Sequence, residues 1–172
     1  HDIKSLRYFI ILTLEKIEMI EVKKLNKKNY KEYEDFLLKF DGTLIYHSTY
    51  FLDHLIHTLG FKQETLIAKI NNKIEGVFPI LSYEGKLGRV FNSLPFFGSY
   101  GGIYFSNQDV LPKLIISFKK LISKNNVLSS TIIQNPFEKF SKSNFDFDFE
   151  EKRIAQYTNI DLKDNHKENL FK

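Results

Sequence analysis

The chain has 172 residues, of which 42% are hydrophobic and 15% aromatic, enough for one domain with a sizeable core and too many for a disordered chain. It contains no cysteine, so disulfide bonds and thiolate metal sites are excluded. The net charge of +4 is carried almost entirely by lysine, because Arg7, Arg89 and Arg153 are the only arginines. This surplus does not by itself predict a nucleic-acid-binding protein.

The first part of the chain, residues 1–18, predicts neither a membrane span nor a signal peptide. Its apolar run, residues 8–14, is far shorter than the roughly 20 residues that a membrane span needs. Acidic and basic residues follow where the small residues of a cleavage site would stand. We therefore expect an extension outside the core, a domain over residues 19–172 with Met19 as its native start, and a cytoplasmic protein.

Two helices are predicted next. Asn29 followed by Glu32 resembles a capping box, and apolar residues recur at helical spacing over residues 30–40. Ser48 can cap a second helix with an apolar stripe over residues 51–59. Gly60 then stands where a left-handed C-terminal cap belongs.

The pattern changes to strands after the second helix. Residues 65–70 and 73–83 flank an Asn-Asn pair, which tolerates positive φ and predicts a β-hairpin. Gly85 and Gly88 predict the following turn. Further extended segments are expected at residues 89–92 and 101–105.

A third helix and three shorter elements complete the chain. Asp109 can cap a helix over residues 111–122, where Pro112 is tolerated because it falls in the first turn. The remaining predictions are a buried strand, a short helix and a final strand, at residues 127–133, 136–143 and 153–160. This order gives an α/β (α+β) fold in which helices flank a mixed sheet, the element order of the GCN5-related N-acetyltransferase (GNAT) fold.

Three stretches also resemble a known family. They are "YHSTYFLDHL", "IAKINNKIEGVFPILSYEGKLGRVFNSLPFFGSYGGIYF" and "YTNIDL", which are similar to the first half of FemAB-like acyltransferases. The resemblance covers most of residues 19–162, and the "SLPFFGSYGG" loop after the "GVFPIL" strand is its most specific part.

The resemblance implies the first, substrate-binding half of a two-lobed acyltransferase, truncated before a second GNAT-like half. Such a protein transfers an aminoacyl or acetyl group to an amine of a cell-envelope precursor, such as a peptidoglycan precursor, or of an amino sugar. The donor would be aminoacyl-tRNA or acyl-coenzyme A, so tRNA is a partner through the donor, and no cofactor is held permanently. The sequence lacks the glycine-rich loop with which ordinary GNAT enzymes hold coenzyme A phosphates before the third helix, which argues against coenzyme A binding by this chain.

An aromatic loop rich in glycine is the candidate substrate-binding site. Its glycines would let the backbone approach an acceptor, its aromatic rings would form flat apolar walls, and its hydroxyls would orient polar groups. The alternative is a packed connection between two strands. The predicted site residues are Ser93, Pro95, Phe96, Phe97, Ser99, Tyr100, Gly101 and Gly102.

Other polar clusters predict ordinary surfaces. His47, Asp53, His54 and His57 lack the ligand spacing of a catalytic zinc site, so no metal is expected. The alternating stretch at residues 145–151 predicts a solvated acidic edge. No catalytic residue can be named from spacing, and a stand-alone ligand-binding module without transfer activity remains the alternative function.

Overall fold

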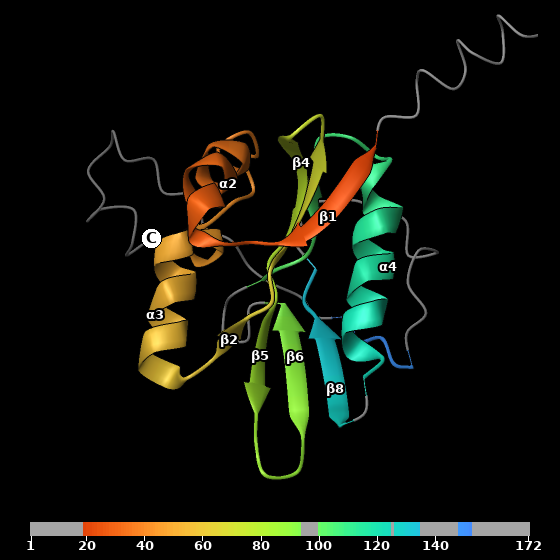
Figure 1. The fold of residues 1–172 in the computed structure, drawn as a ribbon. Helices are drawn as coiled ribbons and strands as arrows, with labels where there is room; N and C mark the ends of the chain where they lie inside the picture. The colour runs from red at the N-terminus through yellow and green to blue at the C-terminus, as the bar shows by residue number, and fades with distance from the viewer. Residues whose placement is uncertain (1–18, 94–99, 125, 135–147, 153–172) are drawn as a thin grey trace, which may run out of the picture.

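The computed structural model describes residues 19–93, 100–124, 126–134 and 148–152. Two four-stranded sheets lie between helices on either side, with α2 and α3 on one side and α4 on the other (Figure 1). The elements in chain order are β1 (Ile20–Lys24), η1 (Lys27–Asn29), α2 (Tyr30–Leu37), η2 (Ile45–His47), α3 (Thr49–Leu59), β2 (Lys62–Gln63), β3 (Leu66–Ile70), β4 (Lys73–Phe78), β5 (Leu81–Glu84), β6 (Arg89–Ser93), β7 (Tyr104–Phe105), α4 (Val110–Ile122) and β8 (Val127–Ile132).

The first sheet is antiparallel throughout, in the order β1-β3-β4-β7. The tight turn between β3 and β4 is made by Asn71 and Asn72, with φ of 50° and 65°. The predicted hairpin and its left-handed turn are therefore confirmed. A register shift between Ala68 and Lys69 marks a bulge in this pair.

The second sheet has the order β2-β5-β6-β8, and its last pair, β6 with β8, is parallel. The chain passes between the sheets at several places, and two of them bear on the sequence predictions. One is the short segment between β4 and β5, which contains Pro79 and Ile80, so the strand predicted over residues 73–83 is divided in two. The other is the segment between β6 and β7, which contains the aromatic loop.

Strand β3 separates two hydrophobic cores. Leu66, Ala68 and Ile70 belong to the core under α4, whereas Ile67 belongs to the core under α2 and α3. Because successive side chains of a strand point to opposite faces, this alternation buries both faces of the strand. The sheet is thus the middle of three layers.

Helix α3 begins and ends as its sequence predicts. The Ser48 side chain accepts a hydrogen bond from the Phe51 amide, and Gly60 adopts the left-handed conformation with φ of 72°. The first predicted helix ends earlier than expected, at Leu37, because the next turns form three-residue hydrogen bonds such as the one from Lys39 N to Phe36 O.

Two predicted helix caps are wrong. Asn29 makes no capping hydrogen bond, and Glu32 reaches away from its own helix. Asp109 likewise makes no side-chain cap; the side chain of Asn107 instead accepts the Asp109 amide at 2.8 Å. Glu32 bonds to the β3–β4 hairpin instead of its own helix, and Asn107 takes the place of Asp109 as the side chain that accepts an amide before α4.

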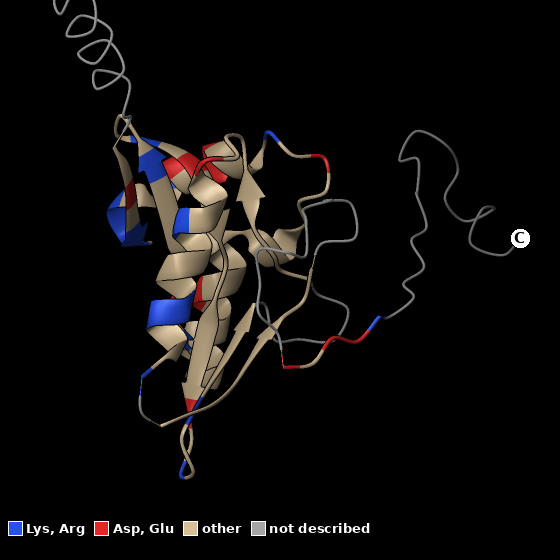
Figure 2. Ribbon diagram, turned by 90° about the vertical axis from the view of Figure 1, so that its right-hand side faces the viewer, with Lys and Arg blue, Asp and Glu red and all other residues tan. Residues whose placement is uncertain are grey.

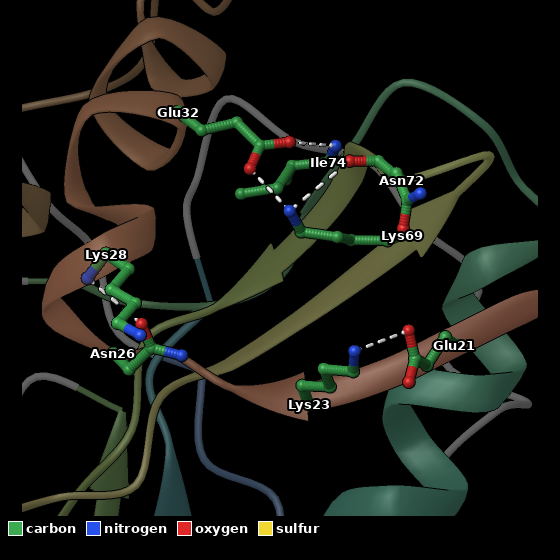
Figure 3. Close-up of polar contacts among 8 residues, drawn as sticks. All are labelled: Glu21, Lys23, Asn26, Lys28, Glu32, Lys69, Asn72 and Ile74. Carbon is green, nitrogen blue, oxygen red and sulfur yellow. Dashed lines mark hydrogen bonds and ion pairs between the residues drawn. The ribbon is translucent and has the colours of Figure 1, made fainter.

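Glu32 fastens α2 to the β3–β4 hairpin, as Figure 3 shows. One carboxylate oxygen accepts the Ile74 amide at 2.9 Å, and the other pairs with the Lys69 ammonium at 2.5 Å. The side chain of Lys69 is 12% exposed and that of Glu32 is 35% exposed, so the pair is partly shielded from water. The ion pair of Glu21 with Lys23 on β1, in the same figure, lies at the surface and contributes far less.

Strand β8 differs from its prediction as a buried strand. Most of its residues are exposed, because it lies at the edge of the second sheet as described and pairs only with β6. The elements predicted at residues 136–143 and 153–160, and the extension at residues 1–18, lie outside the described residues. No helix in the described ranges is long and apolar enough to span a membrane.

Candidate functional site

The candidate site lies where the two sheets separate. Strands β6 and β8 run parallel, and both end here, β6 at Ser93 and β8 at Ile132. Ligands of α/β proteins bind beside the carboxyl ends of parallel strands, where neighbouring connections diverge. We refer to Ser93, Tyr100, Gly101, Gly102 and Ile133 as the seam.

The backbones of Ser93 and Gly101 are in close contact at the seam. A Cβ on Gly101 would lie 2.7 Å from both the Cβ and the carbonyl oxygen of Ser93, so only glycine fits. Gly102 follows with φ of 104°, a conformation that favours glycine. These two positions need their glycines for different reasons, one for space and one for conformation.

Ile133, which follows β8, forms hydrogen bonds with both Ser93 and Gly101. Its amide donates to the Ser93 hydroxyl at 2.8 Å, and its carbonyl accepts the Gly101 amide at 2.9 Å. The side chain of Ser93 therefore takes the place of a backbone acceptor where regular pairing stops. This arrangement fixes how the strands separate.

Aromatic hydroxyls connect the seam to the turn between α2 and η2. Tyr100 donates to the Gly42 carbonyl at 2.8 Å, and Tyr104 lies 3.3 Å from the same oxygen. Tyr33 donates to the His47 carbonyl at 2.9 Å. Tyr33, His47 and Tyr104 are fully buried, so these bonds are made away from water and hold the turn against the seam.

The His47 ring is held neutral at the centre of this network. Its Nδ1 lies 2.9 Å from the Leu44 amide and 3.2 Å from the Leu44 carbonyl. The shorter contact, in which Nδ1 accepts, assigns the ring proton to Nε2, 3.0 Å from the Tyr104 hydroxyl oxygen. Burial lowers the pKa of His47 from 6.5 to about 4, although hydrogen bonds to the backbone of Leu44 and Tyr100 act in the opposite direction. Near neutral pH the ring is an uncharged structural donor.

Four of the predicted site residues, Ser93, Tyr100, Gly101 and Gly102, are buried together at the seam. The Tyr100 hydroxyl, which the sequence assigned to ligand orientation, donates to Gly42 instead. The other four predicted residues, Pro95, Phe96, Phe97 and Ser99, lie outside the described residues. Their contact with a substrate stays a prediction.

Sequence reasoning missed Gly42, His47 and Ile133. His47 was considered only as a metal ligand, and 57 residues separate it from Tyr104. Nothing in the local spacing indicates this pairing. A histidine among aromatic residues just before a helix cap is the only sequence signal that could have suggested a buried position.

The polar side chains of α3 are exposed or bonded to a neighbouring helix. Within the described ranges no group of three or more metal-ligating side chains is found. His54 and His57 are exposed on α3, and Asp53 accepts the Tyr30 hydroxyl at 2.8 Å. Burial and the bond to Asp53 raise the pKa of Tyr30 to about 12. The acidic stretch is exposed at residues 148–151, and its beginning lies outside the described residues.

The backbone amides at the start of α4 are already bonded within the chain. Here the amides of Val110 and Leu111 donate to the carbonyls of Asn107 and Gln108, at 3.3 and 3.2 Å. No glycine is present between β7 and α4, and the glycines at residues 98–102 precede β7 instead.

Charge at this end of α4 is also unfavourable for phosphate. Asp109 precedes the helix, and the Glu75 carboxylate accepts the Ser106 hydroxyl beside it. A shallow depression of about 590 Å³ lies at this end and includes Lys73 and Glu75 in its lining. Two carboxylates at a helix N-terminus oppose the attraction that would hold a phosphate there.

The fold matches those of solved acetyltransferases. An aminoglycoside acetyltransferase from an uncultured soil metagenomic sample, in complex with trehalose, is 12% identical, with a TM-score of 0.54 over 83% of this chain and 97% of that chain. A ribosomal-protein-alanine N-acetyltransferase from Brucella melitensis biovar Abortus 2308 is 10% identical, with a TM-score of 0.50 over 81% and 100%. A probable acetyltransferase is 14% identical, with a TM-score of 0.53 over 82% and 99%.

No family model and no curated protein matches the sequence. The structural likeness, at these identities, shows the fold alone. It confirms the predicted α+β GNAT-like fold class, with the strands divided between two sheets. The FemAB-like and two-lobed assignments stay predictions.

Replacing Gly101 by alanine should destabilise the protein by about 1–3 kcal/mol, because the new Cβ meets backbone atoms that cannot rotate away. Thermal unfolding measures this as a fall in Tm of about 2–4 °C for each kcal/mol. Gly85→Ala is the matched control, since its added Cβ has no neighbour closer than 3.9 Å. Equal melting temperatures for the two variants would contradict the close approach.

Lowering the pH should destabilise the protein through His47. The unfolded chain binds a proton near pH 6.5 and the folded chain only near pH 4, so stability present above pH 6.5 is lost as the pH falls, by up to about 3 kcal/mol. Urea unfolding across this range, compared with His47→Gln, isolates the effect. His57→Gln, on the exposed face of α3, should keep the wild-type pH dependence; if His47→Gln keeps it too, the ring is not the titrating group.

Proposed function

We propose that this chain is the acceptor-binding GNAT lobe of a FemAB-like N-acyltransferase acting on an amine of a cell-envelope precursor or amino sugar in the cytoplasm. The observation that supports it is the seam, where parallel strands end beside two glycines that the backbone geometry requires. It lies in a fold shared with solved acetyltransferases.

The chemistry would be attack of the acceptor amine on the carbonyl carbon of the acyl donor. The C–N bond forms as the bond to the leaving oxygen or sulfur breaks, and a base removes the amine proton. The lobe would contribute mainly orientation, since holding two reactants in attack geometry can supply much of the rate enhancement. The seam glycines would fix where the chain leaves β6 beside the acceptor, and Phe96 and Phe97 would form its apolar walls.

The donor is aminoacyl-tRNA or acyl-coenzyme A. The occupied amides and the carboxylates before α4 favour a donor whose phosphates are not held at that helix. The proposal therefore assigns this chain to the acceptor and places donor binding on other parts of the protein, such as a second GNAT-like half.

A ligand-binding module without transfer activity is the second candidate. The specific observation for it is that His47 and Tyr100, the titratable groups at the centre of the seam network, are engaged in structural hydrogen bonds. Neither is then available as the base that removes the amine proton. A module would bind the same amines and transfer nothing.

Transfer of a labelled acyl group should be measured with the full-length protein, offering charged tRNA and acetyl-coenzyme A in parallel, and an amino sugar or a peptidoglycan precursor as acceptor. We expect product from at least one donor. Phe96→Ala should lower kcat/KM about tenfold, mainly through the acceptor KM, because an apolar wall is lost. The exposed Leu87→Ala is the control.

Acceptor binding without product from either donor would support the module and contradict the transferase. A Phe96→Ala enzyme with unchanged kinetics would contradict the placement of the acceptor beside the aromatic loop. Thermal unfolding of each variant separates loss of fold from loss of binding.

A further inference from the structure

A groove between β1 and the second half of α4 has lysines on both of its walls. It is open and shallow, with a volume of about 280 Å³, and its lining includes the apolar residues Val22, Leu66 and Leu121. The lysines that line it come from segments about a hundred residues apart in the chain: Lys23 and Lys24 on β1, Lys120 on α4 and Lys124 just after it. Figure 2 views the molecule from the α4 side and shows lysine on both elements.

The α4 wall has no opposing charge of its own. Residues 110–134 contain no aspartate or glutamate, and among the described residues Lys120 and Lys124 have no ion-pair partner. On β1, Lys23 pairs with Glu21 at the surface, and Lys24 pairs with Glu64. Because both β1 lysines are paired, the uncompensated positive charge of the groove is that of Lys120 and Lys124.

The stabilisation of α4 by lysines near its C-terminal end does not account for all the lysines on this helix. Lysines in the last turn interact favourably with the negative end of a helix dipole, which explains Lys119 and Lys120. The same dipole disfavours a cation near the beginning, yet Lys113 lies there, on the face that continues through Ser117, Lys120 and Lys124 at spacings of four, three and four residues. A basic stripe therefore follows the whole helix, which is the pattern of a surface for a polyanion.

We propose that this groove binds the phosphate backbone of a nucleic acid. Among the described residues, its lining includes lysine and no arginine or aromatic side chain. Lysine contacts a phosphate as a point charge, whereas paired hydrogen bonds to a carboxylate are typical of arginine and base stacking needs an aromatic ring. The lining therefore favours contacts to phosphates. Its apolar residues Leu66 and Leu121 are buried, which leaves little apolar surface for insertion into a bilayer. We therefore expect the groove to bind the negative charge of the phosphates without preference for a nucleotide sequence.

This proposal does not rest on the seam, because no residue of the groove belongs to it. The groove lies against the outer edge formed by β1, whereas the seam lies at the ends of β6 and β8. Failure of either proposal leaves the other to be judged by its own experiment.

Fluorescence anisotropy with short labelled RNA and DNA duplexes, at about 50 and about 200 mM salt, tests the groove and distinguishes the two sources of phosphate. Each lost phosphate contact should weaken binding roughly tenfold at the lower salt. The double variant Lys120→Gln with Lys124→Gln should therefore bind about a hundredfold more weakly than the wild type. It should also reduce the slope of log K against log salt by about two. The control pair is Lys31→Gln with Lys86→Gln, both exposed and away from the groove, which should bind as the wild type does.

Three results would overturn the proposal. One is no binding of either duplex by the wild-type protein at the lower salt. Another is equal binding by the groove variant and the control variant. The third is salt-dependent binding only to vesicles containing anionic phosphatidylglycerol or only to polyglutamate, which would assign the lysines to a membrane or to an acidic peptide.

Discussion

The contact between the backbones of Ser93 and Gly101 is the constraint on which the rest of the structure depends. It lets the chain leave the second sheet at the end of β6 and enter the first sheet at β7, while Ile133 bonds to both residues from β8. The parallel strands therefore end at an interior position rather than at the rim of the protein. A side chain at Gly101 would force this junction apart, and the division into two sheets would no longer be fixed.

Buried polar groups then hold the helical layer to this junction. The Gly42 carbonyl receives the Tyr100 hydroxyl, and the neutral His47 ring lies against Tyr104. On the far side of α2, Glu32 binds the β3–β4 hairpin through Ile74. Because unsatisfied buried polar groups are costly, these bonds specify one position of the α2 and η2 segment relative to the sheets, and so one shape of the seam.

The sequence predicts those features that local chemistry determines. The Ser48 and Gly60 caps, the Asn71-Asn72 turn and the fold class follow from nearest neighbours and periodicity. Sequence-based prediction fails where a residue distant in the chain determines the local structure. The Glu32 side chain bonds to a hairpin some forty residues away instead of its own helix, and the exposure of β8 depends on its place in the strand order. The glycines of the site were recognisable as special, but the reason, a backbone brought close by folding, was not.

The most direct test of the seam as a ligand site is amide chemical-shift mapping by NMR during titration with an amino sugar such as glucosamine. If the seam holds the acceptor, the largest shifts should occur at the amides of Gly101, Gly102 and Ile133, whose hydrogen bonds and backbone geometry a nearby ligand would perturb. Shifts concentrated instead at the depression before α4, around Asn71 and Gln108, would contradict the account and move the acceptor to the other end of the first sheet.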